Sequence, residues 1–153
     1  MIDYFQQGII SSRGIAMAPR VVFADIQAYL DAIADNPDDN NDVGGSRHLR
    51  FWQVPYQQFI TGIVPGEKCN NAPIQILNKD PTKPNVDPAQ CPLFQALTNP
   101  SGWCTPGLGQ MPKNGPFITD ANYSVKLKNN TTISGQDIIA NIRWWLTNGL
   151  PEK

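Results

Sequence analysis

The chain has 153 residues, of which 41% are hydrophobic, and a formal net charge of −1. This length is enough for one domain with a sizeable core, and the nearly neutral charge gives no electrostatic basis for binding nucleic acid or an anionic membrane. The apolar runs are too short to span a bilayer. Charged residues make up only 16% of the chain, whereas there are 14 prolines and 12 glycines. This composition predicts short helices joined by long loops.

The first part of the chain predicts an arm followed by a helix. Residues 1–20 are weakly patterned, so we expect an N-terminal arm there and a single domain over residues 21–153. The arm has neither the basic segment nor the apolar segment of a signal peptide. A helix is predicted next, and it ends before Asn36-Pro37, because the residue before a proline is disfavoured in a helix. The apolar positions of this helix are Val22, Ile26, Tyr29, Leu30 and Ile33.

The middle of the chain predicts a second short helix and a long connection. Pro55 suits the first turn of a helix, which is expected to stop at Gly62. Val64-Pro65-Gly66 then predicts a turn. Residues 67–87 are rich in proline and predict a linker of a length that is uncommon in compact domains.

Two further helices and a hairpin are predicted in the second half. Asp87-Pro88 offers a capping carboxylate and a first-turn proline, which predicts a third helix as far as Asn99-Pro100. Apolar and polar residues alternate after position 122, and Asn129-Asn130 can take the positive φ of a tight turn, so a small hairpin is expected. Ser134-x-x-Asp137 is a capping box for a last helix that ends near Thr147.

Five segments share a pattern that is recognisable in this order: Phe23–Leu30, Ile63-Val64-Pro65-Gly66, Leu93–Leu97, Gln110-Met111-Pro112 with Gly115-Pro116, and the closing helix with I-x-x-W-L-x-x-G-x-P at residues 142–151. Together they resemble parts of a class I c-type cytochrome domain of the bacterial or planctomycete type. The resemblance implies a mainly α fold, a cytochrome-c-like bundle of about four short helices with long loops and one small β-hairpin. The haem-attachment motif C-x-x-C-H is missing, since no cysteine lies near the single histidine.

Met111 and His48 are the residues through which such a domain would bind haem. The resemblance places Met111 where a cytochrome carries its axial methionine, a soft neutral ligand for iron, and the alternative is a methionine that fills a gap in the core. His48 is the candidate for the opposite ligand of a non-covalently held haem, and the alternative is a packed or surface histidine. Both are therefore candidate cofactor-binding and metal-binding residues, although the leading expectation is a protein without a cofactor.

The three cysteines lie in loop-like surroundings, which suits an oxidising compartment. Cys91 and Cys104 are 13 positions apart, and the chain can turn between them near Pro100, so we expect a disulfide between these two. It would hold the loop of Met111 against the third helix, as haem does in a cytochrome. Cys69 can pair with either partner, and three reduced thiols are also possible, because connectivity cannot be read from a sequence.

No hydrolase, dinucleotide-binding or phosphate-binding motif is present, so the sequence does not indicate an enzyme. There are four tryptophans, more than a small core needs. Trp103, in a glycine-rich loop beside Cys104, is the candidate for an exposed residue that contacts a partner, whereas Trp144 and Trp145 are expected in the core.

The sequence leads to two hypotheses for the function of this protein. The first is a haem-less, cytochrome-c-like structural or protein-interaction module with a protein partner, exported to the periplasm or the cell exterior by a signal that is not in this chain. The second is an electron-transfer or sensor protein that holds haem non-covalently through His48 and Met111. An enzyme or a carbohydrate-binding domain that uses the long linker and Trp103 is a third possibility without a motif behind it.

Overall fold

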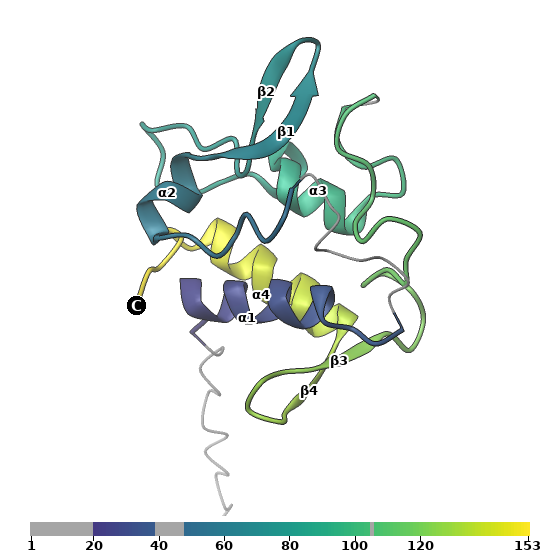
Figure 1. Cartoon of the computed structure of the whole chain (residues 1–153). Coiled ribbons are helices and arrows are strands. Elements are labelled where there is room, and N and C mark those ends of the chain that lie inside the picture. The colour runs from purple at the N-terminus through teal and green to yellow at the C-terminus, as the bar shows by residue number, and fades with distance from the viewer. Residues whose placement is uncertain (1–19, 39–47, 105) are drawn as a thin grey trace, which may run out of the picture.

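The computed structural model describes residues 20–38, 48–104 and 106–153. Figure 1 shows two helices, α1 and α4, side by side in the middle of the molecule, with one β-hairpin projecting on either side of them. The predicted arm lies outside the described residues except for Arg20. The elements are α1 (Phe23–Ala34), α2 (Tyr56–Thr61), β1 (Ile63–Cys69), β2 (Ala72–Gln75), the 3-10 helix η2 (Pro88–Gln90), α3 (Pro92–Thr98), β3 (Ser124–Lys126), β4 (Thr132–Ser134) and α4 (Gly135–Thr147).

The fold is a small mixed α/β fold, so the prediction of a mainly α, cytochrome-c-like bundle is wrong. Of the described residues, 33% are helical and 15% lie in strands. The strands form two separate two-stranded sheets, β1–β2 and β3–β4, both antiparallel. The first of these sheets occupies a segment that the sequence analysis interprets as a turn and a linker.

The β1–β2 hairpin has a physical basis that the sequence analysis missed. Asn70 and Asn71 have φ angles of 49° and 67°, which is the conformation that a two-residue hairpin turn of type I′ requires at both positions. Pro65 is compatible with a strand here, because the register of β1 against β2 shifts between Ile63 and Lys68, and proline is tolerated at such irregularities.

The predictions for α1, α4 and the second hairpin are confirmed. α1 ends at Ala34, before the proline, and the backbone N–H of Val22 donates to Asp25 Oδ2 at 2.8 Å at its start. α4 begins after Ser134, whose Oγ accepts from the backbone N–H of Asp137 at 3.1 Å. In the hairpin, β3 pairs with β4 with Val125 opposite Ile133.

The third predicted helix is interrupted. Asp87 caps its start by accepting a hydrogen bond from Ala89 N–H at 2.9 Å, but only the short η2 follows. Cys91 is extended, with φ −90° and ψ 111°, because it precedes Pro92. A new helix, α3, begins at that proline.

The buried residues form a core cluster to which α1, α2, α3 and α4 all contribute. Its largest fully buried member is Trp145 on α4, whose ring centroid lies 6.3 Å from those of both Phe23 and Phe59. α1 and α4 are also joined by a hydrogen bond in which Asn141 Nδ2 donates to Tyr29 Oη at 2.9 Å. Among the described residues, no helix has the length and apolar character needed to cross a membrane.

Candidate functional site

The buried side of α4 anchors the helix in the core, and this anchoring fixes the position of its solvent-facing side. Ile138, Ile142 and Leu146 are buried there with Trp145. The indole N–H of Trp145 donates to the backbone oxygen of Pro151 at 2.9 Å, so the ring is oriented as well as buried. α4 therefore presents a defined set of side chains on its other side.

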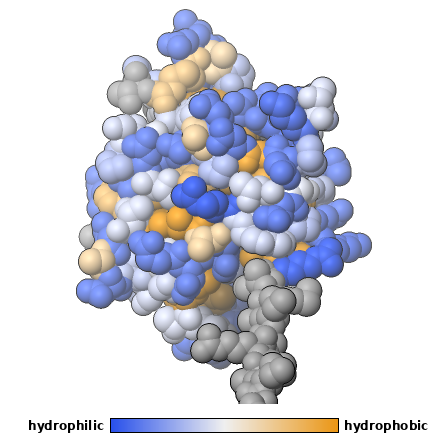
Figure 2. Space-filling model, turned by 180° about the vertical axis from the view of Figure 1, so that it is seen from behind, coloured by the Kyte–Doolittle hydropathy of each residue, from blue (hydrophilic) through white to orange (hydrophobic). Residues whose placement is uncertain are grey.

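A shallow hollow lies on this outer face. Its lining residues recur every three or four positions, so they occupy successive turns of one side of the helix. Ile139 and Trp144 are half-buried, and the others are exposed. The hollow is lined by Gln136, Ile139, Ala140, Arg143, Trp144 and Thr147. Seen from behind, the molecule shows small hydrophobic areas separated by hydrophilic side chains (Figure 2).

Arg143 is the only charged residue among those that line the hollow. Its guanidinium carbon lies 5.0 Å from the centre of the Phe94 ring on α3, a distance at which the ring attracts the cation. Phe94 is itself buried, so the ring is a fixed platform. None of the ion pairs within the described part of the chain involves Arg143.

Trp144 adds a second donor to the hollow. The indole N–H groups of Trp52 and Trp145 donate to acceptors inside the protein, but that of Trp144 meets no acceptor among the described residues. Aromatic residues and arginine are the types that carry most of the energy at protein interfaces. The hollow therefore has the composition of a binding surface.

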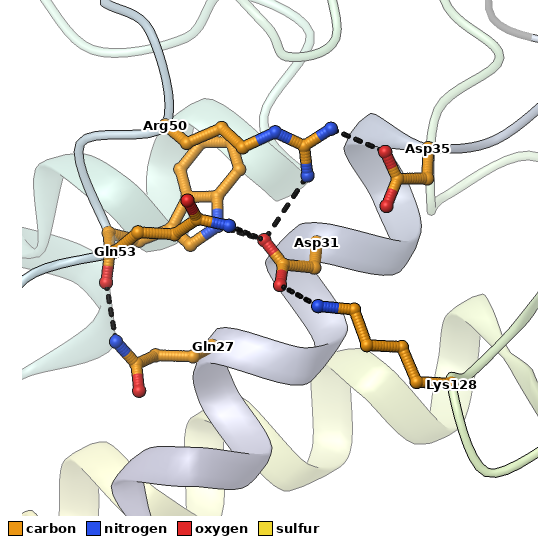
Figure 3. A network of polar contacts seen from close by, with 7 residues as sticks. Gln27, Asp31, Asp35, Arg50, Gln53 and Lys128 are labelled. Carbon is orange, nitrogen blue, oxygen red and sulfur yellow. Dashed lines mark hydrogen bonds and ion pairs between the residues drawn. The ribbon is translucent and has the colours of Figure 1, made fainter.

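A second polar cluster surrounds Asp31, which is the one charged residue among the buried residues of the described chain. Figure 3 shows it at the centre of a network that joins α1, the segment before α2 and the turn of the β3–β4 hairpin. Asp31 Oδ1 accepts from Trp52 Nε1 at 2.9 Å, from Gln53 Nε2 at 2.8 Å and from Arg50 at 3.2 Å, and its Oδ2 accepts from Lys128 Nζ at 3.0 Å. Arg50 also pairs with Asp35.

This network has the properties of a structural anchor. Burial by itself raises the pKa of Asp31, but the hydrogen bonds from Trp52, Lys128 and Gln53 outweigh burial, and the pKa is lowered from its ordinary value. Both oxygens of the carboxylate are already engaged, so Asp31 is a poor acid or base at neutral pH. The sequence analysis missed it because its partners are distant in the chain, Lys128 by 97 positions.

The structure gives the two candidate haem ligands different partners. His48 Nδ1 lies 3.0 Å from the backbone oxygen of Pro65, and its Nε2 lies 3.4 Å from Glu67 Oε1 on β1. Met111 is half-buried against the core, and its backbone N–H donates to Ala96 O on α3 at 2.7 Å. Haem binding by these residues stays a prediction. Within the described ranges, no group of three or more His, Cys, Asp or Glu side chains is placed to hold a metal ion.

The disulfide predicted between Cys91 and Cys104 is not the one that forms. Cys104 is bonded to Cys69, with 5.8 Å between the Cα atoms. The missed hairpin explains the error, because β1 carries Cys69 to the loop of Cys104. Cys91 is fully buried as a free thiol, and burial raises its pKa to about 12. A disulfide is compatible with an oxidising compartment.

Trp103, the predicted interaction residue, is half-buried next to this disulfide. Its backbone N–H donates to Leu108 O at 2.7 Å, and Leu108 N–H donates back at 3.0 Å. Trp144, expected in the core, packs against the core but is only half-buried and lines the hollow. The spacing along α4 contains the signal for this, because Trp144 lies on the side of the helix opposite Leu146.

The comparisons with known proteins add no relative. No protein family, curated protein or solved structure matches this chain, so the resemblance to c-type cytochromes rests on the sequence motifs alone.

Proposed function

We propose that this chain is an exported protein-interaction module that binds a protein partner through the outer face of α4. The proposal keeps the interaction role expected from the sequence and abandons the cytochrome-like bundle. The observation that carries it is the hollow around Trp144 and Arg143, which combines an aromatic ring, a guanidinium held close to the buried Phe94 ring, and apolar floor residues on a well-anchored helix.

Two further observations support this function. The described residues offer no metal-binding group and no pair of a nucleophile with an activating base near the hollow, so binding suits its chemistry better than catalysis. The Cys69–Cys104 disulfide supports export, because such bonds persist in oxidising surroundings.

Site-specific crosslinking tests the proposal. A benzophenone amino acid replaces Ala140 in the hollow or, as the control, Ala72 on β2; both alanines are exposed. After irradiation of cells that make the protein, we expect an adduct of one defined mass from position 140 and none from position 72. Equal adducts from both positions, or none from position 140, would show that the face of α4 is not an interaction surface.

A further inference from the structure

The hollow on α4 offers donors of hydrogen bonds but no carboxylate. Arg143 contributes a planar fork with five N–H donors, and the Trp144 side chain that lines the hollow has an indole N–H without an acceptor among the described residues. Thr147 uses its hydroxyl proton internally, since Oγ1 donates to the backbone oxygen of Arg143 at 2.9 Å. Only the amide of Gln136 offers donor and acceptor together. A ligand that fits this surface must therefore bring acceptors.

The charge around Arg143 leads to the same conclusion. Asp137, the other charged residue of α4, does not line the hollow, because it is held at the helix start, where its Oδ2 accepts from Ser134 Oγ at 2.7 Å. α3, whose Phe94 ring lies close to the guanidinium of Arg143, carries no charged residue. The positive charge of Arg143 is thus not neutralised by either helix that holds it.

The contact with Phe94 places Arg143 for binding a planar anion. Its guanidinium carbon lies within cation–π distance of the buried ring, and its N–H groups match the two oxygens of a carboxylate. Because the ring is buried and fixed, less conformational entropy is lost when a carboxylate binds. Ile139 and Ala140, next to Arg143, provide the apolar floor for a neighbouring side chain of the same ligand.

We propose that the hollow recognises an acidic peptide segment of its protein partner, in which an Asp or Glu side chain pairs with Arg143 and an adjacent large apolar side chain packs on Ile139 and Trp144. This inference rests on the proposed function and adds the chemistry of the partner.

A peptide-display selection on the purified protein tests the inference without the natural partner. We expect random peptides that bind to be enriched in an acidic residue next to Leu, Ile, Phe or Trp. One selected peptide, synthesised with its acidic residue or with the matching amide, is then titrated against the wild type, Arg143→Gln, Arg143→Lys and the control Lys126→Gln, an exposed residue of β3.

Arg143→Gln should weaken binding about tenfold to a hundredfold, as expected for the loss of a charge-assisted hydrogen-bonded pair. Replacing the acidic residue of the peptide should have the same effect, and the two changes together should cost no more than either alone. Arg143→Lys, which keeps the charge but loses the fork, should be intermediate, and Lys126→Gln should bind like the wild type. Circular dichroism of each variant checks its fold.

Three results would overturn the inference: no enrichment, enriched peptides without acidic residues, or equal affinity of wild type and Arg143→Gln. These results leave the crosslinking test untouched, since an adduct from position 140 that Arg143→Gln does not reduce would retain the interaction surface and reject only its preference for acidic partners.

Discussion

Two regions of this molecule are held together by different means. The helix pair, α1 with α4, is joined by buried aromatic rings and by the hydrogen bond from Asn141 to Tyr29, and the network around Asp31 ties α1 to the segment before α2 and to Lys128. The bridged region, which consists of the β1–β2 hairpin with residues 99–104 and 106–108, has little regular structure beyond the hairpin and is closed by the Cys69–Cys104 bond. With few ladder hydrogen bonds, the bridged region is expected to rely on its covalent link more than the helices, which are held by packing.

The largest expected effect concerns the packing of the helix pair. Trp145→Ala should lower the free energy of unfolding by about 5 kcal/mol, the upper end for a buried tryptophan, because it also removes the hydrogen bond to Pro151. Trp144→Ala is the matched control on the other face of the same helix and should cost about 1 kcal/mol. Urea unfolding measures both, and equal losses would show that the two faces of α4 contribute alike.

Removal of the disulfide tests the other side of the comparison. The double variant Cys69→Ala/Cys104→Ala should lose about 4 kcal/mol, as chain entropy predicts for this loop length, with a sequence separation of 35. The backbone N–H groups of Trp103 and Leu108 donate to each other's carbonyl oxygens. Their hydrogen-exchange rates should increase more than those of the amides of α4. Cys91→Ala keeps the bridge and serves as the control. An unchanged urea midpoint in the double variant would mean that packing alone holds the bridged region.

Neutralising the buried carboxylate of Asp31 on α1 should have an intermediate effect on stability. Asp31→Asn preserves shape but cannot accept from Lys128 as a carboxylate does, so we expect a loss of about 2 kcal/mol. Asp38→Asn, an exposed carboxylate with the same change of charge, should cost almost nothing. If the two variants have the same stability in thermal unfolding, the network contributes no net stabilisation.

The same residue predicts a pH dependence. Because the pKa of Asp31 is lowered in the folded state from 3.8, its contribution is complete above that pH and is lost as the pH falls through the lower folded pKa. The stability difference between wild type and Asp31→Asn should therefore shrink below about pH 4. Unfolding curves at several pH values measure this, and a difference that stays constant down to pH 2 would contradict the lowered pKa.

The buried thiol of Cys91 leads to a prediction about chemical reactivity and not about stability. Since its thiol is fully buried with a pKa of about 12, iodoacetamide at pH 8 should not modify the native protein. Unfolding without a reductant should expose one reactive thiol per chain, as mass spectrometry would count. Rapid labelling of the native protein would show that α3 opens readily.

The smallest expected effect concerns haem. If His48 and Met111 do not form a haem site, titration with haem should give the same absorption spectrum for the wild type, His48→Ala and Met111→Ala. A Soret band that depends on both residues would instead favour the electron-transfer alternative.

The predictable part of the fold consists of elements whose signals are local. α1, α4 and the β3–β4 hairpin each carry their periodicity, cap or turn within a few positions, and all three were correctly predicted. β1 was missed because Pro65 and Gly66 resemble a turn when the strand that pairs with them is not considered. The shift in strand register that accommodates Pro65 is a property of the pair and not of either sequence segment.

The candidate site was less predictable for the same reason. The sequence identified Trp103 as the interaction residue from its glycine-rich surroundings, but whether a tryptophan is covered depends on which segments pack against it. The partners of Asp31, Cys69 and Arg143 are all supplied by other elements. Such contacts follow from the tertiary arrangement, which no spacing within the chain specifies.

The buried thiol of Cys91 also has a consequence for oxidative folding. In the unfolded chain, Cys91 and Cys104 are 13 positions apart, whereas the native pair is separated by 35, and shorter loops close more readily. The first bond to form should therefore often be the wrong one. Exchange with the thiolate of Cys69 then converts it to the native bond and releases Cys91. Once α3 packs, the core shields the released thiol of Cys91 from oxidants and from the disulfide. Burial of this thiol therefore keeps the correct pairing from being reversed.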